Sequence, residues 1–338
     1  MKILPVEKAV GMILCQDVTK IVPGEFKGRA FKKGHIIKEE DIPELLKLGK
    51  EHVYVWEAKE GEIHEDEAAI RIARAVSGEN VVFDEPYEGK SSLKSTIKGL
   101  LKVDQELLYE INSVDLVTVA SLPDNFTVEE GQKIAGARVI PLVIEEKIIN
   151  KVEKICSERK IFNVKPYKKM KAGIITTGSE VYKGRIKDRF GPIMIKKLEY
   201  FGAEFLGQIF CPDDVNLIIK GINEMLEKNA EVVILTGGMS VDADDLTPKA
   251  IKECSDHVVT YGAPVQPGNM FMLAYRGNRA LLGVPGCAMY HRTTILDAIL
   301  PRIFVGERLK KEDFIKMGLG GLCQGCEVCR YPNCYFCR

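Results

Sequence analysis

Short apolar runs and amphipathic segments alternate along the second half of the chain. The runs "AGIITTG" and "AEVVILTGG" both end in glycine, which is typical of strands buried inside a parallel sheet. Between them, "VNLIIKGINEMLEKN" carries its apolar residues at helical spacing. Strands alternating with helices predict an α/β fold over residues 166–310, a doubly wound, mainly parallel sheet with crossover helices on its faces.

The first half of the chain has a different pattern. The pattern over residues 1–62 predicts a small α+β region, whose last strand is "EHVYVWE". Over residues 63–165, an amphipathic helix at 64–76 precedes short β-branched runs separated by Gly, Pro, Asn and Asp, and a second helix is expected at 145–158. This pattern predicts a β-rich middle domain. The basic, proline-containing segment 159–171 is the best candidate for a linker. A cysteine-rich tail, 311–338, follows the α/β domain.

Composition narrows the class of protein. In 338 residues, Lys and Arg total 48 and Asp and Glu total 48, so the formal net charge is zero. This balance argues against a broad nucleic-acid surface. The start of the chain lacks a signal-peptide pattern, and there is no run of about 18 apolar residues that could span a membrane. We therefore expect a soluble, cytoplasmic protein with no nucleic-acid or membrane partner.

Three glycine-containing loops each follow a predicted strand: "TTGSEV" at 176–181, "TGGMSVDADD" at 236–245 and "VPGCAMY" at 284–290. In open parallel sheets, ligands bind beyond the carboxyl ends of the strands. Glycine lets the backbone approach a ligand closely, and amides with hydroxyls can cradle a phosphate. The residues expected to bind the ligand are Thr176, Thr177, Gly178, Ser179, Thr236, Gly237, Gly238, Ser240, Asp242, Pro285 and Gly286.

Carboxylates also follow the predicted strands, at Glu180, Asp213, Asp214, Asp242 and Asp245. Acids alone would repel an anion, but acids beside phosphate-binding amides fit a bridging Mg²⁺ ion. That combination indicates chemistry on a phosphate or pyrophosphate. The plainer alternative is that an Asp or Ser after a strand only caps the next helix.

The motifs "IITTGSEV", "PDD", "LTGGMSVDADDLTP", "QPGN" and "GVPG" occur in one order. Together they resemble the molybdopterin-binding domain of molybdenum-cofactor biosynthesis proteins. The segments "KILPVEKAVGMILCQDV" and "FKKGHIIKEEDIPELLKLGKEHVYVWE" look like the flanking regions of molybdopterin molybdotransferases. The resemblance covers most of residues 1 to about 310 and is strongest over 172–306.

The resemblance implies binding of molybdopterin or its adenylylated form, and Mg²⁺-dependent insertion of molybdate with release of AMP. It places catalytic acids at Glu180 and Asp245 and Mg²⁺ ligands at Asp245 and at Asp213 or Asp214. It further implies a homodimer, with a molybdoenzyme or a protein of the cofactor pathway as a partner.

Several positions depart from the family pattern, so a non-catalytic molybdopterin sensor or carrier is the first alternative. A nucleotide pyrophosphatase is the second. His291 and Arg292 are expected to begin a helix after the last loop, with Arg292 the better candidate for a phosphate contact. The departures are Asp242 in place of glycine, Arg189 and Phe190 in place of a Ser-Asn pair, Asn269 and Met270 in place of Lys-Pro, and Cys287 and Ala288 in place of Asn-Pro.

Ten cysteines divide into two groups. Cys15, Cys156, Cys211, Cys254 and Cys287 are scattered and read as buried, reduced thiols. Cys323, Cys326, Cys329, Cys334 and Cys337 lie in the tail, where C-x₂-C steps predict a Zn²⁺ or iron–sulfur site. Five thiols exceed the four ligands that one site needs. The alternative is a redox-sensitive tail without a metal.

Overall fold

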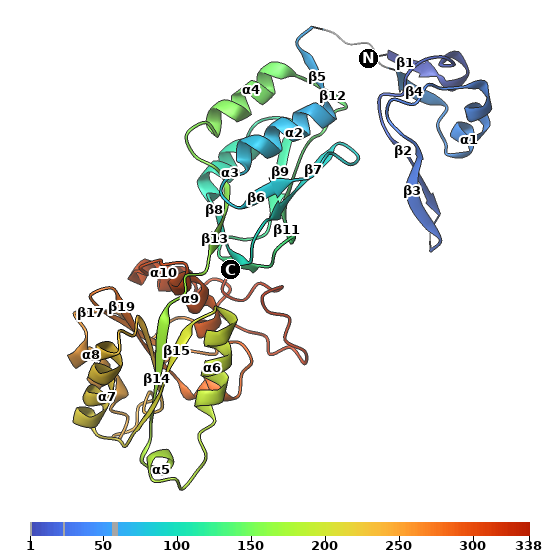
Figure 1. The fold of residues 1–338 in the computed structure, drawn as a ribbon. Helices are drawn as coiled ribbons and strands as arrows, with labels where there is room; N and C mark the ends of the chain where they lie inside the picture. The colour runs from blue at the N-terminus through green and yellow to red at the C-terminus, as the bar shows by residue number, and fades with distance from the viewer. Residues whose placement is uncertain (1, 23, 56–59) are drawn as a thin grey trace. The chain divides into compact units, whose positions relative to one another are not determined.

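A computed structural model describes residues 2–22, 24–55 and 60–338 (Figure 1). The chain forms two compact units. The first contains the described residues up to Thr96 together with Val103–Leu122 and Glu130–Asn163. The second contains Ile97–Lys102, Pro123–Glu129 and Val164–Arg338. No helix among the described residues is long and apolar enough to cross a lipid bilayer.

The N-terminal part of the first unit is built from short strands around one helix. Its apolar core consists of Val6, Ala9, Leu14, Val18, Ile37, Leu45, Val53 and Val55. The predicted strand at 51–57 is present as β4, and its positions 56 and 57 lie outside the described residues. The elements are β1 (Lys2–Pro5) paired with β4 (His52–Val55), β2 (Val18–Val22) paired with β3 (Phe26–Phe31), η1 (Val6–Lys8), η2 (Glu39–Asp41) and α1 (Ile42–Lys47).

The rest of the first unit packs helices against a four-stranded antiparallel sheet, in the order β6-β7-β11-β9. Helix α2 crosses β7 and β11 and buries Ala69, Ile72 and Val76, the stripe that its spacing predicts. The elements are β5 (Glu62–His64), α2 (Glu65–Val76), β6 (Val81–Phe83), β7 (Lys90–Ser95), α3 (Gln105–Asn112), β9 (Val117–Ser121), β11 (Lys133–Val139), β12 (Val143–Glu145) and α4 (Glu146–Ile155). Helix α3 was not predicted.

A small sheet of three strands contains the segment that we expected to be a linker. Its order is β10-β8-β13, from β8 (Gly99–Val103), β10 (Phe126–Val128) and β13 (Phe162–Pro166). The chain passes from the first unit to the second at Asn163 and Val164, inside the predicted linker, but Phe162–Pro166 form a strand rather than the loop that we expected. Phe162 and Val164 are buried, and their alternation with partly exposed neighbours is the two-residue period of a strand. The adjacent lysines and proline hid that short pattern.

The predicted α/β fold is confirmed in the second unit. Its six-stranded sheet has the order β15-β14-β16-β19-β18-β17, in which the first four strands are parallel and the last two antiparallel. The strands are β14 (Lys171–Thr177), β15 (Glu204–Cys211), β16 (Val232–Thr236), β17 (His257–Tyr261), β18 (Met272–Arg276) and β19 (Arg279–Val284). The helices are α5 (Ser179–Tyr182), α6 (Phe190–Tyr200), α7 (Val215–Glu227), α8 (Thr247–Cys254), η3 (Gly286–Met289), α9 (Ile295–Phe304) and α10 (Lys311–Lys316).

Both faces of this sheet are covered, which explains why its strands read as continuous apolar runs. Because neighbouring side chains along a strand point to opposite faces, Ile174 and Ile175 enter different cores. One core lies under α6 and α9 and contains Ile174 with Met194. The other lies under α7 and α8 and contains Ile175 with Ile222. The two helix layers flank the sheet in Figure 1.

Candidate functional site

The predicted loops leave the sheet along one edge, which we call the carboxyl rim. The strand register establishes this arrangement, because Thr177 of β14 pairs with Cys211 of β15, and Thr236 of β16 pairs with both Thr176 and Val284. The loops after β14, β15, β16 and β19 therefore begin side by side. Strand β18 runs the opposite way and starts at Met272, opposite Gly283, so the "QPGN" loop before it reaches the same rim.

The loop after β16, residues 237–241, offers a row of free backbone donors. Within the described part of the chain, the N–H groups of these five residues have no hydrogen-bond acceptor. Gly237 and Gly238 both have positive φ, +86° and +54°. Consecutive N–H groups in such a turn form a concavity that attracts an anion. The loop can therefore receive a phosphate through its main chain.

Close packing fixes this glycine pair. A Cβ on Gly237 would lie 2.2 Å from the Thr177 carbonyl oxygen, and one on Gly238 would lie 2.8 Å from Thr247 Oγ1. Neither position leaves room for a side chain. Glycine is therefore required both by conformation and by the approach of the neighbouring loop.

The threonine hydroxyls at the rim bond to one another. Thr176 Oγ1 lies 3.1 Å from Thr236 Oγ1, and Thr177 Oγ1 lies 3.0 Å from Thr247 Oγ1. Thr247 also donates to the Gly237 carbonyl at 2.9 Å. All four threonines are buried. We expected Thr176, Thr177 and Thr236 to face a ligand, but in the structure their hydroxyls join the first two loops into one rigid base.

The loop after β15 is held to the loop after β14. Ser179 N–H donates to Asp213 Oδ2 at 2.8 Å, and Asp213 N–H reaches back to Ser179 Oγ at 3.5 Å. Asp214 caps α7 by accepting the Leu217 N–H at 3.0 Å. The bonds of Asp213 and Asp214 are those of capping groups.

The remaining carboxylates lie on the ligand loops 176–181 and 236–245 themselves. Asp245 Oδ2 accepts the Asp242 N–H at 2.9 Å, which closes the turn that ends the GG loop. Glu180 is exposed, and its Oε1 would lie 3.0 Å from a Cβ on Gly178. Asp242 and Ser240 are exposed on the same turn. Glu180 is thus the acid most open to solvent beside the first loop.

These acids do not form a ready magnesium site. Across residues 2–22, 24–55 and 60–338, no three His, Cys, Asp or Glu side chains lie where they could hold one metal ion. Asp213, Asp214 and Asp245 each accept a backbone N–H. The donor set as arranged therefore does not fit Mg²⁺, and we derive no step through that ion.

The loop after β19 contains a short 3-10 helix and then an irregular segment. Pro285 is buried and Gly286 is exposed at the rim. The expectation that His291 and Arg292 begin a helix is wrong, because α9 starts at Ile295. Thr294 caps α9 in a capping box with Asp297, and this cap determines the start. His291 and Arg292 stay exposed beside the rim.

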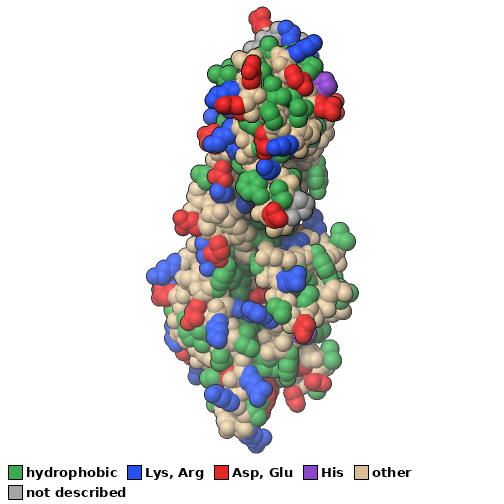
Figure 2. All heavy atoms as spheres, turned by 90° about the vertical axis from the view of Figure 1, so that its right-hand side faces the viewer, with side chains coloured by type: hydrophobic (Ala, Val, Ile, Leu, Met, Phe, Trp, Pro, Cys, Tyr) green, Lys and Arg blue, Asp and Glu red, His purple; other side chains and the backbone are tan. Residues whose placement is uncertain are grey.

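A basic segment between α5 and α6 was missed by our reading of the sequence. Lys183, Arg185, Lys187 and Arg189 are all exposed on the loop that follows the first ligand loop. Their alternation with other residues at every second position was the available signal. Lys and Arg side chains gather at the lowest part of Figure 2, at the height of α5 in Figure 1. Elsewhere on that face both signs of charge are interspersed.

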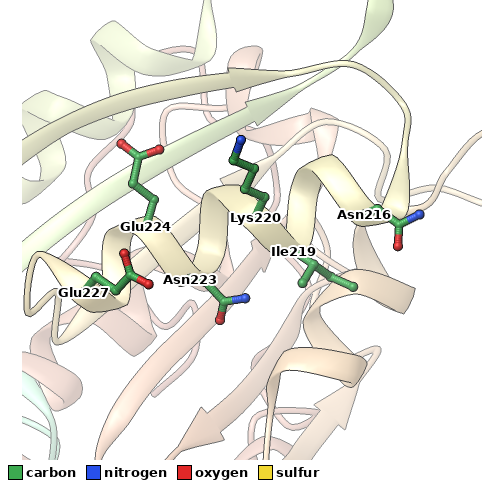
Figure 3. A pocket seen from close by; sticks show the side chains of 6 residues that line it. All are labelled: Asn216, Ile219, Lys220, Asn223, Glu224 and Glu227. Atoms are coloured by element: carbon green, nitrogen blue, oxygen red, sulfur yellow. The ribbon is translucent and has the colours of Figure 1, made fainter.

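A surface pocket of the second unit lies along α7. Its lining residues all come from this one helix (Figure 3), and they run from the rim end of the helix to its far end. Nothing in the sequence pointed to it. The lining residues are Asn216, Ile219, Lys220, Asn223, Glu224 and Glu227.

The tail cysteines lie on the second unit, and all are free thiols. Cys323, Cys334 and Cys337 pack against the core that contains α9. Burial raises the pKa of the Cys337 thiol to about 12; Arg338 opposes this rise, and the thiols of Cys334 and Cys323 add to it. Cys329 Sγ lies 3.1 Å from Thr293 Oγ1, whereas Cys326 is exposed.

Two family models match separate parts of the chain. Residues 173–304 match the family model described as "Probable molybdopterin binding domain". Residues 3–57 match a model described as "Domain of unknown function (DUF8806)".

Curated relatives match the α/β domain over part of its length. A molybdopterin adenylyltransferase from Pyrococcus furiosus is 32% identical over 95 residues, which cover 28% of this chain and 56% of that protein. A CinA-like protein from Petrotoga mobilis is 36% identical over 91 residues, or 27% of this chain and 22% of that protein. The chain thus spans little more than half of the first relative and less than a quarter of the second.

Two solved structures are similar to part of this chain. The molybdopterin biosynthesis enzyme MoaB from Thermus thermophilus has a TM-score of 0.36 and 22% identity over 42% of this chain and 99% of its own. The tungsten-cofactor-synthesising protein MoaB from Pyrococcus furiosus has a TM-score of 0.34 and 23% identity over 40% of this chain and 95% of its own. The family match and the ordered motifs agree on one region: the α/β domain at residues 173–304 belongs to the probable molybdopterin-binding domain family.

Proposed function

We propose that the carboxyl rim binds the phosphate or pyrophosphate of molybdopterin or its adenylylated form, and that the chain acts in molybdenum-cofactor biosynthesis. The observation that carries this proposal is the row of unpaired N–H groups at 237–241, on a domain of a molybdopterin-binding family. Main-chain donors suit an anion whose charge is spread over several oxygens.

The basic segment supports the same ligand. Lys183, Arg185, Lys187 and Arg189 follow the first loop and stay in solvent, where they would raise the local concentration of an anionic ligand. In this proposal the amides determine where the phosphate sits, and the cations increase the rate at which it arrives.

Insertion of molybdate with release of AMP is the reaction that we propose for the bound ligand. Glu180 supports it, because this carboxylate is exposed beside Gly178, on the loop whose Thr177 packs against Gly237. Its part would be to accept a proton from the water that attacks the pyrophosphate, while the P–O bond to AMP breaks and AMP leaves.

A non-catalytic binder is the second candidate, and one observation favours it. Asp213, Asp214 and Asp245 already accept backbone N–H groups, so three of the proposed acids are engaged in holding the loops. A carrier or sensor needs the loops to be rigid and requires no free acid.

One assay separates the two candidates. The purified chain is incubated with adenylylated molybdopterin, molybdate and Mg²⁺, while AMP release and ligand binding are measured in parallel. Release of AMP that depends on both Glu180 and molybdate supports the transferase. Tight binding without AMP leaves the carrier, and absence of binding removes both.

A further inference from the structure

Tyr261 is an aromatic residue at the end of β17, a strand whose end we did not expect to take part in the site. It pairs with Met272 of β18, and Met272 pairs with Gly283 of β19. Strand β17 runs antiparallel to β18 and therefore in the same direction as β19. Tyr261 thus lies at the carboxyl rim, in the same row of the sheet as Gly283.

The Tyr261 side chain and the GG loop lie on the same face of the sheet. Residues paired across adjacent strands point to the same face, and Met272 belongs to the core under α7 and α8. Met239 of the GG loop belongs to that core as well and lies over Gly283, where an added Cβ would be 2.5 Å from Met239 Cε. Buried Met239 therefore holds the loop on the face to which Tyr261 points.

The phenol of Tyr261 contacts the GG loop directly. Its Oη lies 3.5 Å from the Ser240 carbonyl oxygen, to which it can donate. Burial raises the pKa of Tyr261, and the negative charge of Asp245 raises it further, so the phenol also lies near the carboxylate that closes the turn. The ring is thereby placed beside the row of free N–H groups at 237–241.

The ring of Tyr261 is open to solvent, with 46% of the residue exposed. Tyr87 and Tyr200 are exposed to a similar extent, but their rings are covered by Arg29 at 3.9 Å and by Lys98 at 3.5 Å. Within the described ranges, no cation or second aromatic ring lies on Tyr261. Its ring can therefore receive another planar group.

A tyrosine at such a place suits a flat ligand. Its side chain has only two rotatable bonds, so little conformational entropy is lost when it binds, and aromatic rings prefer offset stacking on other planar rings. Val241, the next residue after Ser240, is 84% exposed and adds apolar surface to the same loop. Ligand sites commonly combine such apolar surface with a few well-placed polar groups.

We propose that Tyr261 is the platform on which a planar nitrogen heterocycle of the ligand stacks, while the phosphate of the same ligand lies against the N–H groups of 237–241. This inference rests on the proposed function and adds the ligand class: phosphates that carry a flat ring, either pterin or adenine, in preference to sugar phosphates. Tyr261 contacts the ring and no reacting atom, so its role is to determine specificity.

The test is calorimetric titration of the full chain with inorganic pyrophosphate, with molybdopterin and with AMP, in the wild type and in Tyr261→Leu. Pyrophosphate affinity should be unchanged, whereas affinity for a ligand whose ring stacks on Tyr261 should fall about 5- to 150-fold, the usual effect of removing one stacking side chain. A loss for molybdopterin assigns the pterin to Tyr261, and a loss for AMP assigns the adenine. Tyr261→Phe, which keeps the ring, should restore the affinity.

Tyr335→Leu is the matched control, because Tyr335 is 51% exposed and its Oη also donates to a backbone carbonyl, that of Leu322 at 2.9 Å. It should bind all three ligands as the wild type does. Unchanged affinity for both ring-bearing ligands in Tyr261→Leu overturns this inference alone, as does an equal loss of pyrophosphate affinity, which would make Tyr261 a support of the loop. A wild-type chain that binds no pyrophosphate overturns the proposed function as well.

Discussion

At the scale of single residues, the main claim concerns Gly237. A methyl group there would lie 2.2 Å from a carbonyl oxygen, at a φ of +86°. The loop must shift to accept it, and forced backbone of this kind costs about 1–3 kcal/mol.

We therefore predict that Gly237→Ala lowers the affinity for molybdopterin by about 5- to 150-fold, since 1.4 kcal/mol is one decade in affinity. Gly277→Ala is the matched control, because Gly277 also has positive φ, +58°, but no atom of the described residues lies within 4 Å of the added Cβ apart from the glycine itself and its chain neighbours. Calorimetric titration of both variants with molybdopterin measures the two affinities. Equal affinities would show that the GG loop does not hold the ligand.

Variants of Asp214 distinguish a capping role of its side chain from a metal-binding role. Its side chain accepts the Leu217 N–H at 3.0 Å, and removal of such a cap costs about 0.5–2 kcal/mol. We predict that Asp214→Ala lowers the melting temperature, whereas Asp214→Ser, which keeps a capping oxygen, restores stability and leaves ligand binding unchanged. Loss of Mg²⁺-dependent binding or turnover in Asp214→Ser would return Asp214 to the metal site.

At the scale of elements, the start of α2 contains a histidine that must be neutral. His64 is 3% exposed, and its Nδ1 receives hydrogen bonds from Lys33 Nζ at 2.7 Å and from the Asp66 N–H at 3.1 Å. An ammonium and a backbone N–H can only donate, so Nδ1 carries no proton. Nε2–H then donates to the Cys15 carbonyl at 2.6 Å.

Burial is the largest cause that lowers the pKa of His64 below its ordinary value of 6.5, and the charge on Lys33 adds to it. A group with a depressed folded-state pKa contributes stability above its unfolded pKa, and this contribution is lost as the pH falls through the folded value. We predict that the first unit melts at a lower temperature at about pH 5.5 than at about pH 7.5.

The variant His64→Asn keeps a capping side chain and removes the titrating ring. The difference in melting temperature between the two pH values should shrink in this variant. Glu65 changes stability with pH in the opposite direction to His64. Its pKa is raised, mainly by burial and further by the charge on Asp66. The stability that Glu65 contributes at low pH is lost as the pH rises above about 4.5. An acid-induced loss of equal size in His64→Asn would contradict the assignment.

The elements of the second unit could be predicted from sequence because their signals are strong and local. Helix α7 spans 13 residues with an apolar stripe, and β16 is five buried residues that end at two glycines. Strand β13 and helix α3 escaped prediction. Phe162 and Val164 make a two-residue pattern among lysines and a proline, too short to distinguish from a loop.

The site could be predicted only in part for a related reason. The sequence shows which loops follow strands, and parallel strands bring those loops to one edge. It does not show what each hydroxyl or carboxylate bonds to. Thr177 and Thr236 face inward and bond within the protein, and Asp213 holds the Ser179 amide. Those partners depend on tertiary packing between distant loops.

At the scale of the whole molecule, the tail and the ligand loops are physically connected. Gln266 pairs with the tail backbone, and Thr293 contacts Cys329. A ligand that restrains either of these loops therefore also restrains the tail, and such coupling is reciprocal.

The central claim is that main-chain N–H groups at the carboxyl rim bind a phosphate. Its most direct test is calorimetric titration of the full chain with molybdopterin and with the same pterin after removal of its phosphate. The account predicts that only the phosphorylated ligand binds and that inorganic pyrophosphate competes with it. Equal binding of both pterins, or binding of neither, would contradict it.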